Sequence, residues 1–531
     1  MFLKNFNSKE NYILSAILTF YFFLNFYQLN FQEWSGMMDH DFYILYNSLL
    51  ISSGLEQEGR DHPALITFVL HGFIFKIVDI FQGSFSSNIF EILNSNKISE
   101  TFQFYFEISR ITNFFINLVL FLVFLRLLKI LEINKKITFF VCVIFLSSSW
   151  YFLSFFATRS ENLSLLFMLF SMLCIAKKED LKIKNYFFSG IFFSLAMFTK
   201  IQIIFFTPFL IFFIGNILPN KDKVDMRFLN YEINTKYFFY SLIIIILGYL
   251  IFQLKIQEFP RFERNKYFDV LIFFIGLVSI SLYFFITSKF KNKLLKEKFI
   301  LFSAVLNGFA FCFFLLVLLD ILNIIPINDF IYLRISNPIH YLSEFALVFS
   351  EGSVNSKFVL ELIFKIFKSY DQSFFELLLL IILIFLITKN YLMKKDINIF
   401  NIYFLFIIFL FITLMNGLRP SIYYHTYYTI SYLILFSISL NTLNKKYFNF
   451  FSICAILIFL LNNYFLNPYL IPSNDRYVKI FDRESLILDV CNEFKYSLKS
   501  DHNDASLFYL NYYHKKFDNK SLVSLCKELK I

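Results

Sequence analysis

Acidic and histidine side chains gather in a short polar segment that follows the first long apolar stretch of the chain. Asp39, His40 and Asp41 are adjacent, and Asp61 and His62 follow later in the same segment. Ionisable groups at a membrane boundary are costly to place, so such a cluster is a candidate for function. A carboxylate can take a proton from an attacking hydroxyl or amine, and two carboxylates can hold a divalent ion. The alternative interpretation is a hydrated loop whose acids only keep it in water.

The composition indicates the class of protein that carries this cluster. The chain has 531 residues, of which 58% are hydrophobic and 17% are charged, whereas soluble proteins average roughly 25% charged residues. Apolar runs long enough to cross a bilayer recur along the sequence. The net charge of +10 comes from lysine clusters between these runs, so we expect no nucleic-acid partner. The sequence therefore predicts an all-α polytopic membrane protein.

The basic clusters also predict the topology. They recur in every second loop, which is typical of cytoplasmic loops, and place the N-terminus inside and the C-terminus outside. One loop, with Lys255 and Arg261, departs from this pattern. About thirteen spans are expected, near residues 12–31, 108–128, 137–157, 160–176, 186–199, 201–218, 237–254, 268–287, 299–322, 373–389, 399–415, 427–443 and 447–465.

Three predicted outer segments are too long to be simple turns. The first, about 32–107, carries the acidic cluster, and its part from Pro63 to Ile80 has the apolar spacing of a helix that lies in the membrane interface. The second is about 323–372. The third is the tail 466–531, which returns to a soluble composition. We therefore expect a transmembrane domain at 1–465 and a small outer domain at 466–531.

Other predicted outer positions offer cations. Arg159 lies between two spans with Glu161, Lys200 lies at a hairpin tip, and Arg419 precedes Tyr423, Tyr424 and His425. Cations of this kind can hold a phosphate that leaves an activated sugar while a base deprotonates the acceptor. In the alternative interpretation, Lys200 and Arg159 extend to lipid headgroups and the tyrosines from Tyr423 to Tyr428 form an interfacial belt.

Cysteine positions predict one disulfide. Cys491 and Cys526 are the two cysteines outside apolar spans, and both lie in the tail. An oxidising outer compartment would let them pair. No cysteine or histidine spacing typical of a zinc site is present in the sequence.

Several of these segments resemble one family. Residues 34–43 with 49–55 and 61–65 are similar to the first outer loop of GT-C glycosyltransferases. Residues 157–162 resemble the Ala-Arg-x-Glu turn of that family, and residues 190–200 resemble its helix ending in Thr-Lys. The segment 419–428 is similar to its late Arg-Tyr loop. The similarity is greatest to the bacterial branch of aminoarabinose transferases, protein mannosyltransferases and rhizobial core-sugar transferases.

The resemblance implies a polyprenyl-phosphate-linked sugar as donor and an inverting transfer to a glycolipid, polysaccharide or protein acceptor at the outer face of a bacterial inner membrane. Asp39 or Asp41 would be the general base, and Lys200, Arg419 and Arg159 would hold the donor phosphate. The remaining candidate substrate-binding residues are His40, Tyr43, Asp61, His62, Glu161, Tyr423 and His425. No cofactor is required by this resemblance, although Asp39 and Asp41 could hold a divalent metal.

Departures from the family pattern leave alternatives open. Ala64 stands where the family often has a second proline, Ser194 stands where it has a glycine, and His40 separates the two acids, so either aspartate can be the base. A lipid-linked sugar transporter would need charges in the middle of spans. An O-antigen ligase or polymerase would depend on Arg334, His340 and the late loop instead.

Overall fold

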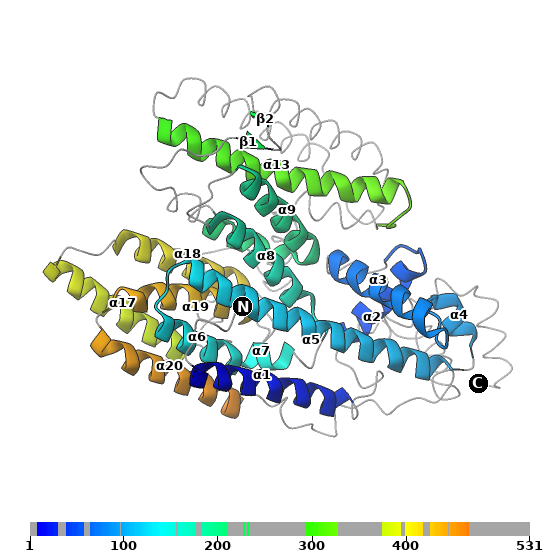
Figure 1. Ribbon diagram of the computed structural model, residues 1–531, viewed down its shortest axis with the longest axis horizontal. Helices are drawn as coiled ribbons and strands as arrows, with labels where there is room; N and C mark the ends of the chain where they lie inside the picture. Colours follow the sequence, from blue (N-terminus) through cyan, green and yellow to red (C-terminus); the bar gives the residue numbers. More distant parts are fainter. Residues whose placement is uncertain are drawn as a thin grey trace, which may run out of the picture.

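The computed structural model is helical almost throughout its described part (Figure 1). It describes residues 8–29, 39–57, 64–95, 97–154, 158–176, 183–210, 227–228, 231–232, 293–327, 374–394, 399–417, 425–443 and 445–466. The helices of the first half are α1 (Ser8–Leu29), α2 (Asp39–Ser52), α3 (Leu65–Gln82), α4 (Ile89–Asn94), α5 (Ile98–Ile130), α6 (Lys135–Ser147), α7 (Ser149–Ser154), α8 (Ser160–Ala176), α9 (Ile183–Thr199) and the 3-10 helix η3 (Ile201–Phe206). Those of the second half are α13 (Lys293–Ile321), α17 (Phe374–Lys394), α18 (Ile399–Gly417), α19 (His425–Asn441) and α20 (Lys445–Leu466).

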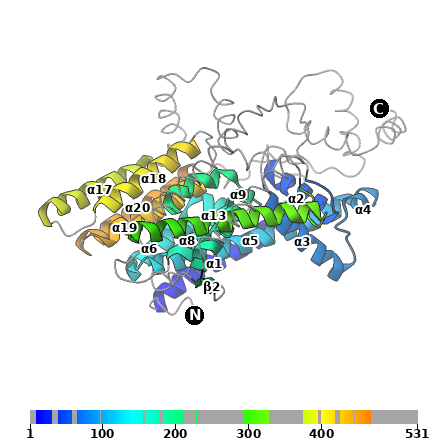
Figure 2. The same ribbon diagram turned by 90° about the horizontal axis from the view of Figure 1, so that it is seen from above.

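Strand structure in the described residues amounts to one short antiparallel pairing. Strand β1 (Arg227–Phe228) pairs with β2 (Tyr231–Glu232). Figures 1 and 2 show α17–α20 at one end of the long axis and α2–α4 at the other, with α5, α8 and α9 between them. The described architecture therefore confirms the prediction of a helical fold.

Three described helices are long and apolar enough to cross a membrane, judged by length and composition. They are Leu65–Gln82, Glu100–Ile130 and Ala304–Ile321. Shorter apolar helices lie at Tyr12–Phe23, Ser160–Ala176, Ile201–Leu210, Leu377–Lys389, Ile402–Thr413 and Asn449–Leu460. The predicted spans 237–254 and 268–287, the outer segment 328–372 and the tail from residue 467 lie outside the described residues, so the number of thirteen stays a prediction.

Helix α3 occupies the segment for which the sequence predicts an interfacial helix. Its buried face includes Leu65, Phe68 and Phe75, whereas Phe81 is 87% exposed. The helix ends at Gly83, whose φ of 64° lies in the left-handed region that glycine adopts without strain. Its length and composition also suffice for a transmembrane span, which the sequence analysis did not assign to it.

The helix over the predicted span 137–157 is interrupted. Helix α6 ends at Ser147, Ser148 has extended backbone angles (φ −72°, ψ 137°), and α7 begins at Ser149. The Ser148 hydroxyl donates to the Phe145 carbonyl at 2.6 Å. Serine side chains compete with the backbone for hydrogen bonds in this way, and three in a row favour a break in the helix.

Helices α9 and α13 cross with their backbones in direct contact. A Cβ atom added to Gly190 would collide with the Val305 carbonyl of α13, and one added to Gly308 would collide with the Phe187 carbonyl of α9. Small residues allow this approach between helices in a membrane, where van der Waals packing drives association. The crossing fixes α9, the helix that leads into Lys200.

The segment that joins α5 to α6 is hydrogen-bonded to the end of α19. The Asn134 amide donates to Asn441 Oδ1 at 3.1 Å, and the Asn134 side chain accepts from the Lys136 amide at 3.0 Å, so it also caps the start of α6. Lys129, Lys135 and Lys136 belong to the predicted cytoplasmic clusters and lie on either side of this contact in the sequence. The bundle therefore has a basic end where α5 and α19 finish.

Substitution of either crossing glycine should destabilise the bundle. We expect Gly190→Ala or Gly308→Ala to lower the free energy of unfolding by about 1–3 kcal/mol, because a methyl group would force the two backbones apart. Thermal unfolding of the purified protein in detergent measures the effect. Phe188→Ala, at a position of α9 that is 46% exposed, is the control. Equal unfolding temperatures for the glycine variants and the wild type would contradict the close crossing.

Candidate functional site

The predicted site residues fall into three groups in the structure. Side chains are described for Arg159, Glu161 and Lys200. Asp39, His40, Asp41 and Tyr43 belong to the first turns of α2 and His425 begins α19, but their side chains lie outside the described set. The remaining predicted positions lie outside the described residues: Trp34, Asp61, His62, Arg419, Tyr423, Tyr424, Cys491 and Cys526.

Two predicted site residues form a buried ion pair. Lys200 Nζ lies 3.0 Å from Glu161 Oε1, and the two side chains are 2% and 4% exposed. Glu161 lies in the first turn of α8 and Lys200 directly follows α9. The dipole at a helix N-terminus favours an anion and that at a C-terminus favours a cation. Each charge therefore lies at the helix end that stabilises it.

Arg159 adds a second cation to this pair. Its side chain is buried, with 7% exposed, and its positive charge acts on the Glu161 carboxylate together with that of Lys200. Within the described part of the chain, Glu161 Oε2 has no hydrogen-bond partner. Arg159 and Lys200 are both buried, whereas the alternative interpretation has both side chains extend outward to lipid headgroups.

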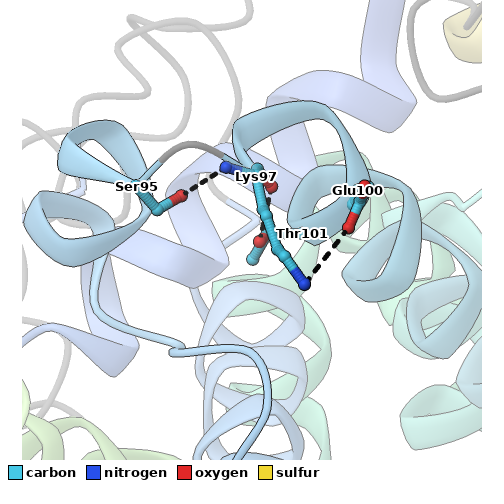
Figure 3. Close-up of polar contacts among 4 residues, drawn as sticks. All are labelled: Ser95, Lys97, Glu100 and Thr101. Carbon is cyan, nitrogen blue, oxygen red and sulfur yellow. Dashed lines mark hydrogen bonds and ion pairs between the residues drawn. The ribbon is translucent and has the colours of Figure 1, made fainter.

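A surface ion pair in the same chain shows the contrast. Lys97 Nζ lies 3.9 Å from Glu100 Oε2, and these side chains are 65% and 64% exposed (Figure 3). Exposed pairs of this kind are screened by water and contribute little to stability. Lys97 is instead held at the start of α5 through its backbone, since its amide donates to Ser95 Oγ and its carbonyl accepts from Thr101 Oγ1 (Figure 3).

A buried amide network supports the first turn of α8. Asn162 donates to Asn117 Oδ1 at 2.7 Å, Asn117 donates to the Ser154 carbonyl at 2.9 Å, and Asn113 donates to the same carbonyl. The Tyr151 hydroxyl donates to the Asn117 carbonyl at 2.8 Å. Because Ser154 ends α7, its carbonyl would otherwise lack a helical partner. The network joins α5, α7 and α8 immediately beside Glu161.

This network was not predicted from the sequence. Its signal was the polar spacing Ser109, Asn113, Asn117 within the predicted span 108–128, since residues four apart share one helix face. All three side chains are buried, at 1%, 0% and 0% exposed. A polar stripe on an apolar helix predicts a buried polar contact, but the sequence does not say with which helix.

The start of α2, which carries Asp39 and Asp41, lies at the same end of the bundle as the ion pair. Ile44, early in α2, belongs to one buried cluster with Ala64 and Phe68 at the start of α3, and Gly72 further along α3 lies against the Ser48 carbonyl. The two helices are therefore parallel, and their N-terminal ends lie together. The first residue of α3 shares a buried cluster with Phe198 at the end of α9.

The late tyrosine segment reaches the same region. Tyr427 in the first turn of α19 contacts Phe206 of η3, with ring centroids 5.8 Å apart, and η3 directly follows Lys200. Tyr427 and Tyr428 are 0% and 1% exposed. These two tyrosines are core residues, in contrast to the interfacial belt of the alternative interpretation, while the side chains at 421–425 lie outside the described set.

The described side chains do not include a metal site. No group of three or more histidine, cysteine, aspartate or glutamate side chains suited to a metal lies among them. Because the side chains of Asp39 and Asp41 are not part of that set, the prediction of a divalent ion there stays a prediction. The cysteines whose surroundings are described, Cys142, Cys174, Cys312 and Cys454, are free thiols.

Removal of the lysine of the buried pair should destabilise the protein more than removal of the exposed one. We expect Lys200→Met to cost about 3–5 kcal/mol, because it leaves a buried carboxylate without its closest partner. The loss should fall near the lower end, since Arg159 still acts on Glu161. The double variant Glu161→Gln/Lys200→Met should recover most of it. Thermal unfolding in detergent of the wild type, Glu161→Gln, Lys200→Met and the double variant measures the coupling energy between the two side chains.

The control for that cycle is Lys97→Met, for which we expect a loss below about 1 kcal/mol. A Lys200→Met protein as stable as the wild type would show that the pair does not form.

Comparisons with protein-family models, with curated proteins and with solved structures found no match to this chain. We therefore infer the function from the residues and from their arrangement. That arrangement gathers the ends of α2, α3, α8, α9 and α19 in one region.

Proposed function

We propose that this protein is a membrane glycosyltransferase of the GT-C type, which moves a sugar from a polyprenyl-phosphate donor to an envelope glycolipid, polysaccharide or protein. The observation that carries the proposal is the convergence of helix ends. Segments 34–43, 61–65, 157–162, 190–200 and 419–428 resemble family motifs, and the helices that they start or finish meet in one region. If these segments resembled the family motifs only by chance, there would be no reason for their helix ends to converge in the folded chain.

The roles of the residues follow from their chemistry. Asp39 or Asp41, at the start of α2, is the proposed base that takes the proton of the acceptor hydroxyl or amine. Lys200, Arg159 and Arg419 are the proposed cations that stabilise the departing phosphate. Glu161 holds Lys200 in place before the donor arrives, which is supported by their 3.0 Å contact.

The proposed placement in the membrane follows the positive-inside rule. The end of the bundle near Lys129, Lys135 and Lys136 faces the cytoplasm, and the converging helix ends face the outside. We propose about thirteen spans, with the N-terminus inside and the tail 466–531 outside, in a bacterial inner membrane. The lipid tail of the donor would lie between spans, which explains why one small reactive region is surrounded by so much apolar structure.

A lipid-linked sugar transporter is the second candidate, and one observation favours it. Arg110 lies within the apolar stretch of α5, is 4% exposed and has its guanidinium 4.8 Å from the centre of the Phe106 ring. Charges within spans are typical of transport pathways. Asp320, a buried acid in α13, has a structural role instead, since its Oδ1 accepts from the Ile327 amide at 2.9 Å. A transporter would move the lipid without cleaving its sugar–phosphate bond.

Loss of the proposed base should abolish sugar transfer. We expect Asp39→Asn or Asp41→Asn to lower the rate about 10²- to 10⁴-fold while the protein stays inserted and abundant, because a general base contributes that factor. Mass analysis of envelope glycolipids from cells lacking the gene, complemented with each variant, measures the product. Glu91→Gln, at an exposed acid of the same outer segment, is the control.

Wild-type product levels from both aspartate variants would show that the base lies elsewhere, and would favour the ligase or the transporter. A ligase would depend on Arg334, His340 and the segment 419–425 rather than on these acids.

Loss of the proposed phosphate ligands should weaken donor use. We expect Arg419→Ala, and Lys200→Met in the Glu161→Gln background, to raise the donor KM about tenfold or more, because each removes a charge-assisted hydrogen bond. Initial rates against polyprenyl-phosphate-sugar concentration in membranes measure KM and kcat separately. Lys97→Ala is the matched control. Unchanged donor kinetics in both variants would remove these residues from the proposed phosphate site.

A further inference from the structure

One buried side chain, that of Asn117 in α5, binds both ends of the turn that leads from α7 into α8. Its amide nitrogen donates to the carbonyl of Ser154, the last residue of α7, at 2.9 Å. Its amide oxygen accepts from Asn162, in the first turn of α8, at 2.7 Å. Arg159 lies between these two anchor points in the sequence. The turn that carries a proposed phosphate ligand is therefore bridged by a single amide.

The chemistry of this bridge requires an amide. An asparagine side chain offers a donor and an acceptor, whereas a carboxylate only accepts and a leucine of similar shape does neither. Asn117 and Asn162 are 0% and 1% exposed, so the loss of either bond is not offset by a bond to bulk water. Asn117 is itself held to α7, because its backbone carbonyl accepts from the Tyr151 hydroxyl at 2.8 Å.

Arg159 depends on such a bridge more than the other charges of the candidate site. Glu161 and Lys200 hold each other through their 3.0 Å contact. Arg159 instead lies just before α8 and outside it, where the backbone is not fixed by the hydrogen bonds of a helix. A binding group must be held within about half an ångström of its productive position by the residues around it. Asn117 fixes the backbone on both sides of Arg159.

We propose that Asn117 is a positioning residue for Arg159. By bridging the two ends of the turn, it holds the guanidinium in the place where the donor phosphate binds, and it makes no contact with the donor itself. This inference rests on the proposed function, in which Arg159 is one of the phosphate ligands, and it adds a residue that the family resemblance did not indicate.

The test measures the binding of two lipids to the purified full-length protein in nanodiscs. The probes are polyprenyl phosphate and the polyprenol of the same chain length, which lacks the phosphate. The ratio of their dissociation constants, the phosphate advantage, reports on the proposed cations and is not changed by a partial loss of folded protein. We expect Asn117→Leu to lower the phosphate advantage about 3- to 10-fold, because Arg159 loses its fixed position.

A second substitution shows whether Asn117 acts through Arg159. We expect Arg159→Met to lower the phosphate advantage by the same factor or more, since it removes the cation itself. Adding Asn117→Leu to Arg159→Met should lower it no further, because no guanidinium remains to be positioned. Asn162→Ala removes only the bond to α8 and should reproduce the effect of Asn117→Leu, so it replaces that variant if Asn117→Leu fails to fold.

The matched control removes equally buried hydrogen bonds from another part of α8. The Ser171 hydroxyl lies 2.9 Å from the Ser189 carbonyl and 2.8 Å from the Ser189 hydroxyl, and both residues are buried. Ser171→Ala should lower the unfolding temperature, as Asn117→Leu should, since each leaves a buried polar group without its partner. The phosphate advantage should stay at the wild-type value in Ser171→Ala.

Three results would overturn the inference while the proposed function stands. These are an undiminished phosphate advantage in both Asn117→Leu and Asn162→Ala, a further loss when Asn117→Leu is added to Arg159→Met, and an equal loss in Ser171→Ala. A full phosphate advantage in Arg159→Met would also overturn it, leaving Lys200 and Arg419 as the proposed ligands. A wild type with no phosphate advantage would contradict the proposed function itself, and the inference would fail with it.

Discussion

The buried pair of Glu161 and Lys200 is the interaction on which the rest of the candidate site depends. Two charges cannot be removed from water unless each is given a partner at close range, and here the partners come from two helices with a 3.0 Å contact between them. The pair therefore requires that the start of α8 and the end of α9 stay in register. Helix dipoles add to its stability at both ends, and the nearby charge of Arg159 acts on the same carboxylate.

Other contacts hold α8 and α9 in the relative position that the ion pair requires. The glycine crossing fixes α9 against α13, and the amides of Asn117 and Asn162 join α8 to α5 and to the end of α7. In an apolar environment such contacts matter, because lipid and side chains are equally apolar and the hydrophobic effect does not distinguish them. The interrupted helix at Ser148 fits the same arrangement, since the Ser154 carbonyl that ends α7 accepts hydrogen bonds from α5.

The described part of the candidate site is dominated by charge. Arg159, Glu161 and Lys200 are all buried, and two of the three are cations. A buried set with an excess of positive charge suits an anion, which is why the proposed function gives these residues a phosphate to hold. The buried amides of Asn117 and Asn162 lie beside this set and position the helix that carries Glu161.

The sequence alone determined the helical membrane class, because long apolar runs leave few other structures. It identified Arg159 and Lys200 as site candidates from their charge in an apolar chain, and Glu161 from the family resemblance. It did not pair Glu161 with Lys200, because residues 39 positions apart in the sequence meet only through the packing of α8 on α9. Nor did it predict the break at Ser148 or the buried amides of α5. Periodicity shows which face of a helix is polar, but only the tertiary structure decides which neighbour that face meets, because this depends on how the other helices fill the remaining volume.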